Sequence, residues 1–376
     1  MIENRAEQIS LFELLARDWS FDSEIVQIEF NHDESAVLFR LLSGNLALVS
    51  TIDAESPKNR TRVAVDTGQT TIKQRTKPIA AAIFSSLKAN TDLAVVKFGS
   101  DSFMALDSNG VLNQVSAQGQ SVATRGLNDA SVTALCSTQT GDTLAIAQKS
   151  GVTIFATEEM QELMDIRSSR PISCMSFSET GNKLAVWGVD CLTVIDIKNP
   201  NNPPREIQGV SNVTQLTWDK SESLLACASS SQSFHIVDIH AGTFHQVKNY
   251  PSPVNNAIFS EKGKALVTSG AYRLTGWSIN NLPQNNHSGT PLVTGKPGLI
   301  VIDAIAAHPK RSLVAAGYAN GLITISSIGT PQEMMVHQES GTKISQLAWS
   351  KSGEHLAIGF ESGKAAIVSF PDQLFK

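Results

Sequence analysis

The most constraining feature of this sequence is a motif that recurs eight times along its 376 residues. Each copy starts with an apolar residue, reaches an anchor residue five positions later, and continues through a turn into an apolar strand of the Leu-Ala type. Repeats of about 40 to 50 residues are typical of the four-stranded blades of β-propellers. The eight anchors are Phe30, Phe84, Ser137, Phe177, Trp218, Phe259, Ala307 and Trp349.

Turn glycines follow the same period. One set lies four positions after the anchor and a second set fourteen positions after it. A repeated backbone geometry explains glycine at both offsets, because glycine adopts positive φ without steric cost. Strand-length apolar runs dominate and no long helical periodicity is present. The sequence therefore predicts an all-β fold, a closed propeller of eight four-stranded blades formed by one domain over residues 1–376.

The repeats resemble those of the WD-repeat family of β-propellers over essentially the whole chain. The resemblance lies in the stretches 172–185, 254–266 and 344–359. The Trp-Asp pair that ends the third strand in that family is replaced here by Ile195-Asp196, Val237-Asp238 and Trp277-Ser278, and the Gly-His pair is missing. The chain thus looks like a divergent, WD40-like member. The resemblance implies a rigid ring that binds proteins with its top face, where the turns after the second strands and before the first strands meet.

The second repeat allows two interpretations. In one, Ile79 to Phe84 is the innermost strand of a second blade. In the other, three strands come from residues 93–98, 102–107 and 111–117, with a hairpin turn at Ser108-Asn109-Gly110. Seven blades with an elaborated region are therefore the alternative to eight.

Ring closure requires a fourth strand for the last blade, since an open sheet edge would leave backbone groups unpaired. Few residues follow Val368, and Pro371 disfavours a strand there. We expect residues 1–24 to close the ring, with a strand around Leu11–Leu15. A helix from about Ala6 to Arg17 is the alternative.

Composition limits the functional classes. A net charge of -5 provides no global attraction for nucleic acid or anionic lipid. The N-terminal residues do not resemble an export signal and no apolar stretch reaches membrane-spanning length, so we expect a cytoplasmic protein without nucleic-acid or membrane partners. Four cysteines occur singly within predicted strands, as expected for reduced thiols: Cys136, Cys174, Cys191 and Cys227.

The search for catalytic or metal-binding motifs gives no convincing candidate. His235, His240 and His245 recur every five residues, but this spacing matches no strong zinc pattern. No nucleophile, phosphate-loop or Cys-x-x-Cys motif is present. We therefore predict no enzyme activity, no cofactor and no metal. A metal-dependent hydrolase or lactonase with its site at the central channel, near Asp303, is the competing hypothesis.

The leading hypothesis is a scaffold or adaptor that binds one or more unidentified proteins. Tyr318 and Phe360 lie at corresponding positions after second strands, and Tyr272 lies two residues later in its own turn. These rings either form an exposed contact arc or pack over the strand ends. The residues assigned to the protein-binding site are Tyr272, Arg273, Tyr318, Asn320, Phe360 and Glu361.

Two insertions interrupt the repeats. Residues 50–78 have a local excess of positive charge, which suggests either an acidic partner or a solvated outer strand that its charges protect from edge pairing. Residues 280–298 are rich in Asn, Pro and Gly and are expected to form a loop on the lower face.

Overall fold

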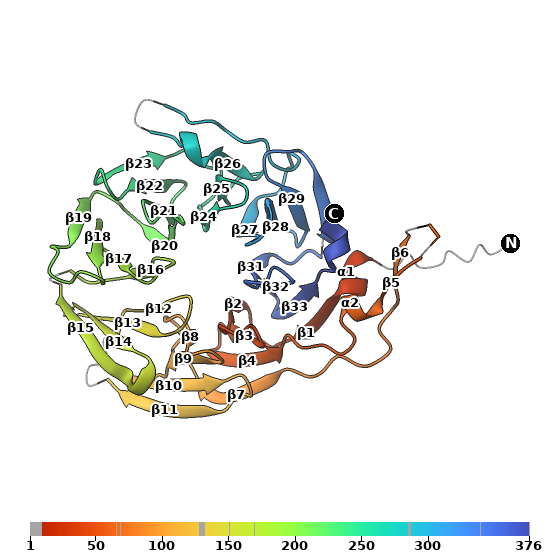
Figure 1. The fold of residues 1–376 in the computed structure, drawn as a ribbon, viewed down its shortest axis with the longest axis horizontal. Coiled ribbons are helices and arrows are strands. Elements are labelled where there is room, and N and C mark those ends of the chain that lie inside the picture. The colour runs from red at the N-terminus through yellow and green to blue at the C-terminus, as the bar shows by residue number, and fades with distance from the viewer. Residues whose placement is uncertain are drawn as a thin grey trace.

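The computed structural model shows eight small sheets arranged radially in a closed ring (Figure 1). It describes residues 10–375 apart from 65, 68, 128–131, 150, 169, 285–286 and 339. Seven sheets have four strands and one has three, and all neighbouring strands within the blades are antiparallel. The predicted eight-bladed propeller is confirmed.

The first four blades follow one another along the chain, each from its innermost to its outermost strand. Their strands are β2 (Ile25–Phe30), β3 (Ala36–Leu41), β4 (Asn45–Ser50) and β7 (Ile83–Lys88); β8 (Val96–Phe98), β9 (Ser102–Leu106), β10 (Val111–Ser116) and β11 (Ser121–Gly126); β12 (Ala134–Ser137), β13 (Thr143–Gln148), β14 (Gly151–Ala156) and β15 (Gln161–Arg167); β16 (Cys174–Phe177), β17 (Lys183–Gly188), β18 (Cys191–Asp196) and β19 (Arg205–Gln208).

The last four blades complete the ring. Their strands are β20 (Val213–Trp218), β21 (Leu224–Ser229), β22 (Phe234–Asp238) and β23 (Thr243–Val247); β24 (Ala257–Ser260), β25 (Ala265–Thr268) and β26 (Thr275–Ser278); β27 (Ile302–Ala307), β28 (Leu313–Tyr318), β29 (Ile323–Ser327) and β30 (Glu333–His337); β31 (Ile344–Trp349), β32 (His355–Phe360) and β33 (Lys364–Ser369), with β1 (Ala16–Ser20).

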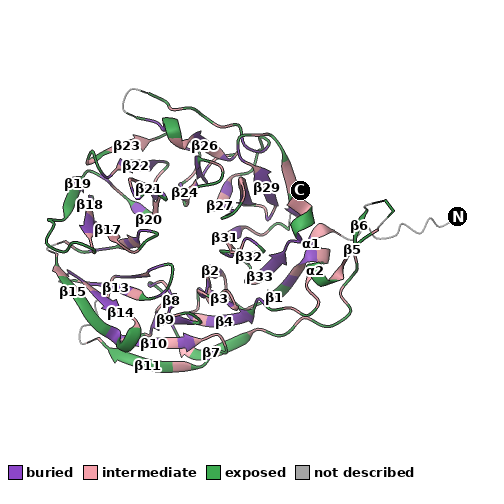
Figure 2. Cartoon of the chain, viewed as in Figure 1, coloured by how far each residue is buried: buried purple, intermediate pink, exposed green. Residues whose placement is uncertain are grey.

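The hydrophobic core lies mainly between neighbouring blades, because each sheet packs both faces against its neighbours. The second strand of a blade is buried on both faces, as β32 shows from Leu356 to Phe360. The outermost strands are the most exposed (Figure 2). The four cysteines lie on strands and are free thiols, as expected.

The N-terminal segment closes the ring, as predicted, but with different residues. Strand β1 pairs antiparallel with β33, from Ala16 opposite Val368 to Ser20 opposite Lys364. Leu11–Leu15, expected to be a strand, is the short helix α1. The reason is local: the Ser10 hydroxyl accepts a hydrogen bond from the Glu13 amide at 3.2 Å, and the Glu13 carboxylate accepts one from the Ser10 amide at 2.8 Å. This capping box favours a helix start at that point.

The structure shows that the predicted first strand of the second blade, Ile79 to Phe84, is wrong. Phe84 lies on β7, the outermost strand of the first blade, where Ala47 is its partner on β4. The anchor of the second blade is Phe98, at the end of β8. Strands β8, β9 and β10 correspond to the three runs of the alternative interpretation, and the blade count is nevertheless eight.

The insertion between β4 and β7 is ordered against the closing segment rather than being a simple outer strand. It contains helix α2 (Pro57–Arg60) and a hairpin of β5 (Thr61–Val63) and β6 (Thr70–Ile72), which projects outward from the ring near α1 in Figure 1. The Arg60 guanidinium donates a hydrogen bond to the Leu14 carbonyl at 2.6 Å. Part of the positive charge of this insertion is thus used in internal contacts.

The second insertion crosses from the lower face to the top face. The Ser278 amide donates to the Thr290 carbonyl at 3.0 Å and the Leu292 amide donates to Gly276 at 2.9 Å, so this segment takes the place of a fourth strand beside β26. Its end reaches the top face, since the Gly298 amide donates to the Tyr272 carbonyl at 3.0 Å. The prediction that residues 280–298 form a loop on the lower face is therefore wrong.

The described residues also form short 3-10 helices at Glu158–Met160, Ile279–Asn281 and Asp372–Phe375. None of the helices in the described part of the chain has the length and apolar character needed to cross a membrane.

Candidate interaction surface

The predicted binding residues lie on the top face, at the ends of the second strands of the last three blades or in the turns that follow them. Tyr272 and Arg273 lie between β25 and β26, and Asn320 and Glu361 lie in the next two turns around the ring. Tyr318 and Phe360 are the last residues of β28 and β32. The turns thus place all six residues on one side of the ring.

The three aromatic side chains differ in exposure, which corrects the idea of a continuous exposed arc. Tyr318 is only 6% exposed and Phe360 only 1%, whereas Tyr272 is 46% exposed. Tyr318 and Phe360 still belong to their strands, opposite Ile302 and Ile344, and pack in the interior between blades. For these two rings, packing over the strand ends is the correct interpretation.

Two exposed apolar residues that sequence reasoning missed accompany Tyr272. Leu299 is 91% exposed and Ile300 is 37% exposed. Only Val301 separates them from β27, and in the sequence they look like the beginning of that strand. The only signal was the preceding Pro297-Gly298 pair, which is typical of a turn. We call Tyr272, Leu299 and Ile300 the top apolar patch.

Backbone hydrogen bonds hold the two segments of this patch together. The Gly270 amide donates to the Ile302 carbonyl at 2.9 Å, and the Ile302 amide donates to Ala271 at 2.9 Å. The Ala319 amide in the neighbouring turn donates to Val301 at 3.0 Å. The patch therefore lies on a frame that joins the sixth and seventh blades.

The predicted polar residues have distinct roles around this frame. The Arg273 guanidinium donates to the carbonyls of Thr294 at 3.3 Å and Gly295 at 2.9 Å, so it anchors the ascending segment. The Asn320 side chain accepts a hydrogen bond from the Leu322 amide at 3.2 Å. Glu361 is exposed, and its side chain forms no ion pair with the residues described.

A cavity of about 700 Å³ lies at the top end of the central channel. Four innermost strands carry an irregularity in register at the same place, and this bulge turns one side chain of each strand towards the channel mouth. These residues line the cavity: Val26, Thr214, Asp303 and Ser345. Three of the four residues are polar, so the repeated bulge contributes to the polar lining of the mouth.

Charges at the channel mouth are few and partly paired. The Lys343 ammonium lies 3.4 Å from the Asp303 carboxylate. Burial raises the pKa of Asp303, and Lys343 opposes that shift. Burial also raises the pKa of Glu24, with a further contribution from Glu361. The competing enzyme hypothesis would require several acidic ligands to converge here on a metal.

Metal-ligating side chains do not gather in this way anywhere in the described part of the chain, where no group of three or more His, Cys, Asp or Glu could hold an ion. Of the three regularly spaced histidines, His235 is buried on β22, His240 is in the following turn and His245 is on β23. Burial raises the pKa of the Cys136, Cys174 and Cys227 thiols, which disfavours the nucleophilic thiolate.

The fold is shared with solved propellers despite low sequence identity. The C-terminal WD40 domain of Sif2 is 14% identical, with a TM-score of 0.60 over 95% of this chain and 99% of that chain. The Cps50 (Swd1) β-propeller domain of Myceliophteria thermophila is 12% identical, with a TM-score of 0.55 over 95% of this chain and all of that chain. A chain of a mitotic checkpoint complex is 14% identical, with a TM-score of 0.56 over 76% of this chain and 93% of that chain.

Sequence comparisons find neither a matching protein-family signature nor a matching curated protein. The likeness is thus one of architecture. On these grounds the chain has the fold of a WD40-like β-propeller.

Proposed function

We propose that this protein is a non-enzymatic scaffold that binds a partner protein through the top apolar patch. The observation that supports this most directly is the exposure of Tyr272, Leu299 and Ile300 on a hydrogen-bonded frame. A few side chains at the centre of an interface contribute most of the binding free energy, and tyrosine is among the residues most often found there. Because the frame is already formed, little conformational entropy is lost on binding.

The surroundings of the patch fit the anatomy of a protein interface. Polar and charged residues flank it, among them Asn320 and Glu361 in the adjacent turns and the exposed Lys296 on the ascending segment. Interfaces typically combine an apolar centre with a polar rim. One of the similar folds was solved within a multiprotein complex, which agrees with this kind of role. We place the partner complex in the cytoplasm, with neither nucleic acid nor membrane as a partner.

The test is co-purification of partners from the native source with quantitative mass spectrometry. We expect Tyr272→Ala combined with Leu299→Ser and Ile300→Ser to reduce partner recovery at least about tenfold, since hot-spot truncation costs about 2 kcal/mol or more. Val122→Ser is the matched control, because Val122 is 63% exposed but lies on the outer strand β11. If the triple variant and the control recover equal amounts of the partner protein, the top apolar patch is not the binding site.

A further inference from the structure

The fold leaves one apolar segment on the rim of the ring uncovered. Residues 78–82 continue without a turn or bend into β7, the outer strand of the first blade, and run along the perimeter in Figure 1. Ile83 is 46% exposed and Phe84 is 52% exposed. Ala80 and Ala81 are exposed as well. The segment lies across the ring from β26 in Figure 1, so it is separate from the top apolar patch.

The backbone of this segment is unpaired on its outer side. The sheet of the first blade ends with β7, and among the described residues no strand lies beyond it. The amides of residues 79–82 donate no hydrogen bond to any described residue. The Trp19 indole donates to the Ala80 carbonyl at 2.8 Å, which holds the segment beside β1. The segment therefore offers free donors and acceptors to an added strand.

The segment also lacks the charges that normally protect a free edge. Exposed edge strands usually carry charged residues, which discourage pairing with another chain. No charged residue occurs between Lys77 and Lys88. The edge thus combines an unpaired backbone with apolar side chains.

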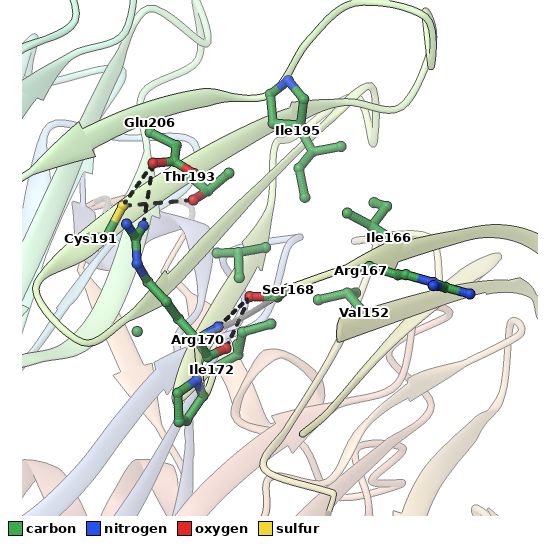
Figure 3. A pocket seen from close by; sticks show the side chains of 14 residues that line it. Val152, Ile166, Arg167, Ser168, Arg170, Ile172, Cys191, Thr193, Ile195 and Glu206 are labelled. Carbon is green, nitrogen blue, oxygen red and sulfur yellow. Dashed lines mark hydrogen bonds and ion pairs between the residues drawn. The ribbon is translucent and has the colours of Figure 1, made fainter. Parts of the chain in front are cut away.

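The outer strands of the third and fourth blades show the usual protection, on either side of a cleft of about 160 Å³ (Figure 3). Strand β15 ends in the exposed Arg167, whose side chain points away from the cleft. Glu206 on β19 pairs with the Arg170 guanidinium at 3.3 Å. The edge of the first blade has no such charges and is therefore open to pairing.

The sequence of the segment is a palindrome. Residues 79–83 read Ile-Ala-Ala-Ala-Ile in both directions. Consider two copies that pair antiparallel about a twofold axis at Ala81. Ala81 then lies opposite itself, and Ile79 of each copy lies opposite Ile83 of the other. Every side chain of the ladder thus meets one of the same kind, and the alanines at its centre allow close approach.

The same register suits the flanks of the segment. Lys77 lies opposite Ser85 of the other copy, and Lys88 lies opposite Gln74. Like charges therefore do not face each other, which would be destabilising across a strand pair. Pro78 has no amide hydrogen and ends the ladder on its N-terminal side.

Neighbouring blades hold the exposed side chains in place. The Phe84 ring packs edge-on against Phe21, with 5.6 Å between the ring centroids. A Cβ atom on Gly119 would lie 2.9 Å from the Ile83 Cγ2 atom, so the turn between β10 and β11 packs closely against Ile83. Because these contacts already fix the strand, pairing loses little conformational entropy.

We propose that this protein forms a symmetric dimer in which residues 79–83 of two copies pair as antiparallel edge strands. The occupant of the edge is a second copy because the palindrome and the absence of charge are complementary to themselves. A strand from another protein would require neither property. A short ladder buries less than the roughly 1,200–2,000 Å² of stable interfaces, so the dimer is weak, with a Kd of about 10–100 µM.

The experiment is sedimentation of the full chain from about 1 to 500 µM, over which the mass should double. Ala81→Glu places two carboxylates opposite each other and should keep the chain monomeric, and so should Ala81→Lys with two ammonium groups. An equimolar mixture of the two variants should dimerise again, because opposite charges then meet at the axis. This recovery also shows that both variants are folded.

Ala241→Glu is the matched control, since Ala241 is an exposed alanine in the turn between β22 and β23 of the fifth blade. It should dimerise like the wild type. A wild-type chain that stays monomeric up to about 500 µM, or an Ala81→Glu variant that dimerises as well as the wild type, would refute the proposal.

A cross-link tests the register. Opposite residues of an antiparallel pair have Cα atoms about 4.5–5.5 Å apart, which a disulfide can span. Ala81→Cys should therefore form an intermolecular disulfide on mild oxidation, whereas Ala241→Cys should not. The wild type supplies the background from its four free cysteines. A dimer that does not cross-link at position 81 would show that another surface is paired.

Discussion

At the scale of single residues, equal position in a repeat does not give equal exposure. Tyr318 and Phe360 end their strands and turn into the interior, whereas Tyr272 lies beyond the end of β25 and is solvent-exposed. Side chains alternate between the two faces of a strand only as far as the strand extends, and a residue beyond its end follows the turn instead. The blade-specific end of the strand therefore decides which ring can contact a partner.

This difference predicts opposite consequences of truncation. Phe360→Ala should lower the free energy of unfolding by about 3–5 kcal/mol, because it leaves a cavity in the core. Tyr272→Ala should change it by less than about 1 kcal/mol, as is usual for surface positions. Chemical denaturation of both variants measures the effect. A stability loss for Tyr272→Ala that matches Phe360→Ala would contradict the assignment of these rings.

His235 predicts a pH dependence of stability. It is 1% exposed, and its Nδ1 atom has no hydrogen-bond partner among the residues that the structure describes. Burial, with a smaller contribution from Lys248, lowers the pKa of His235 to about 4 from an ordinary value of 6.5. The unfolded chain therefore binds a proton in this range that the folded chain does not, so this histidine reduces stability as the pH falls from 6.5 to about 4.

The check is His235→Leu. Its thermal midpoint relative to the wild type should rise as the pH is lowered from 6.5 towards 4, and the difference should be constant above pH 7. Burial also lowers the pKa of His308 to about 4. Because His308 is present in both proteins, its effect on stability cancels when the two thermal midpoints are subtracted. Parallel curves for the two proteins over the whole range would exclude this role of His235.

At the scale of elements, the first insertion stabilises the ring closure. Besides the contact of Arg60 with Leu14, the Arg17 guanidinium on β1 donates to the Thr51 carbonyl at 3.2 Å and lies 3.8 Å from the Asp53 carboxylate. Glu55 holds the far end of the insertion, because its carboxylate accepts hydrogen bonds from the Thr76 amide at 2.8 Å and the Lys77 amide at 2.9 Å. The insertion thus holds β1 in place, and Glu55 ties its two ends together.

Acid should release this insertion. The hydrogen bonds from Lys77 and Thr76 lower the pKa of Glu55 from 4.5 to about 2. Because the pKa of Glu55 is lower in the folded protein than in the unfolded chain, its carboxylate contributes fully to stability above pH 4.5. This contribution is lost as the pH falls towards the pKa of the folded protein. Hydrogen exchange at Thr76 and Lys77, corrected for intrinsic pH effects, should therefore lose protection between pH 4.5 and 2. The Glu55→Gln variant should lack this pH dependence. If the exchange profiles of the variant and the wild type were identical, Glu55 would not be the group that holds the insertion.

At the scale of the whole molecule, the ring closes with a strand from the other end of the chain. Five residue pairs join β1 to β33 within the last blade, and the Ser345 hydroxyl donates to the Ile25 carbonyl at 2.6 Å between the last blade and the first. Closure leaves no blade without neighbours on both faces. The ring should therefore unfold as a cooperative unit whose weakest point is the seam.

Removal of residues 1–23 should expose the edge of β33 and lower the thermal midpoint by several degrees or cause aggregation. A synthetic peptide of residues 10–24, added in trans, should restore the midpoint in a concentration-dependent way. A peptide of the same composition in scrambled order is the control. A truncated chain as stable as the full chain would show that β1 contributes nothing to closure.

The sequence predicted the eight-bladed ring and its closure because both follow from local, repeated patterns. It did not predict the second blade correctly, since an insertion separates β4 from β7 and an apolar run such as Ile83-Phe84 fits an inner or an outer strand equally well. Phe98 lies at the more regular distance from Ser137, which was the available signal.

By itself, then, the sequence determined the all-β class, the repeat and the need for a closing strand. Only the tertiary structure decided that the Tyr318 and Phe360 rings are buried, that Leu299 and Ile300 are exposed beside Tyr272, and that the third and fourth blades leave a cleft. The physical reason is that periodicity specifies the pairing of neighbouring strands, whereas exposure depends on strand ends and on contacts between blades. Those contacts join residues that lie far apart in the chain.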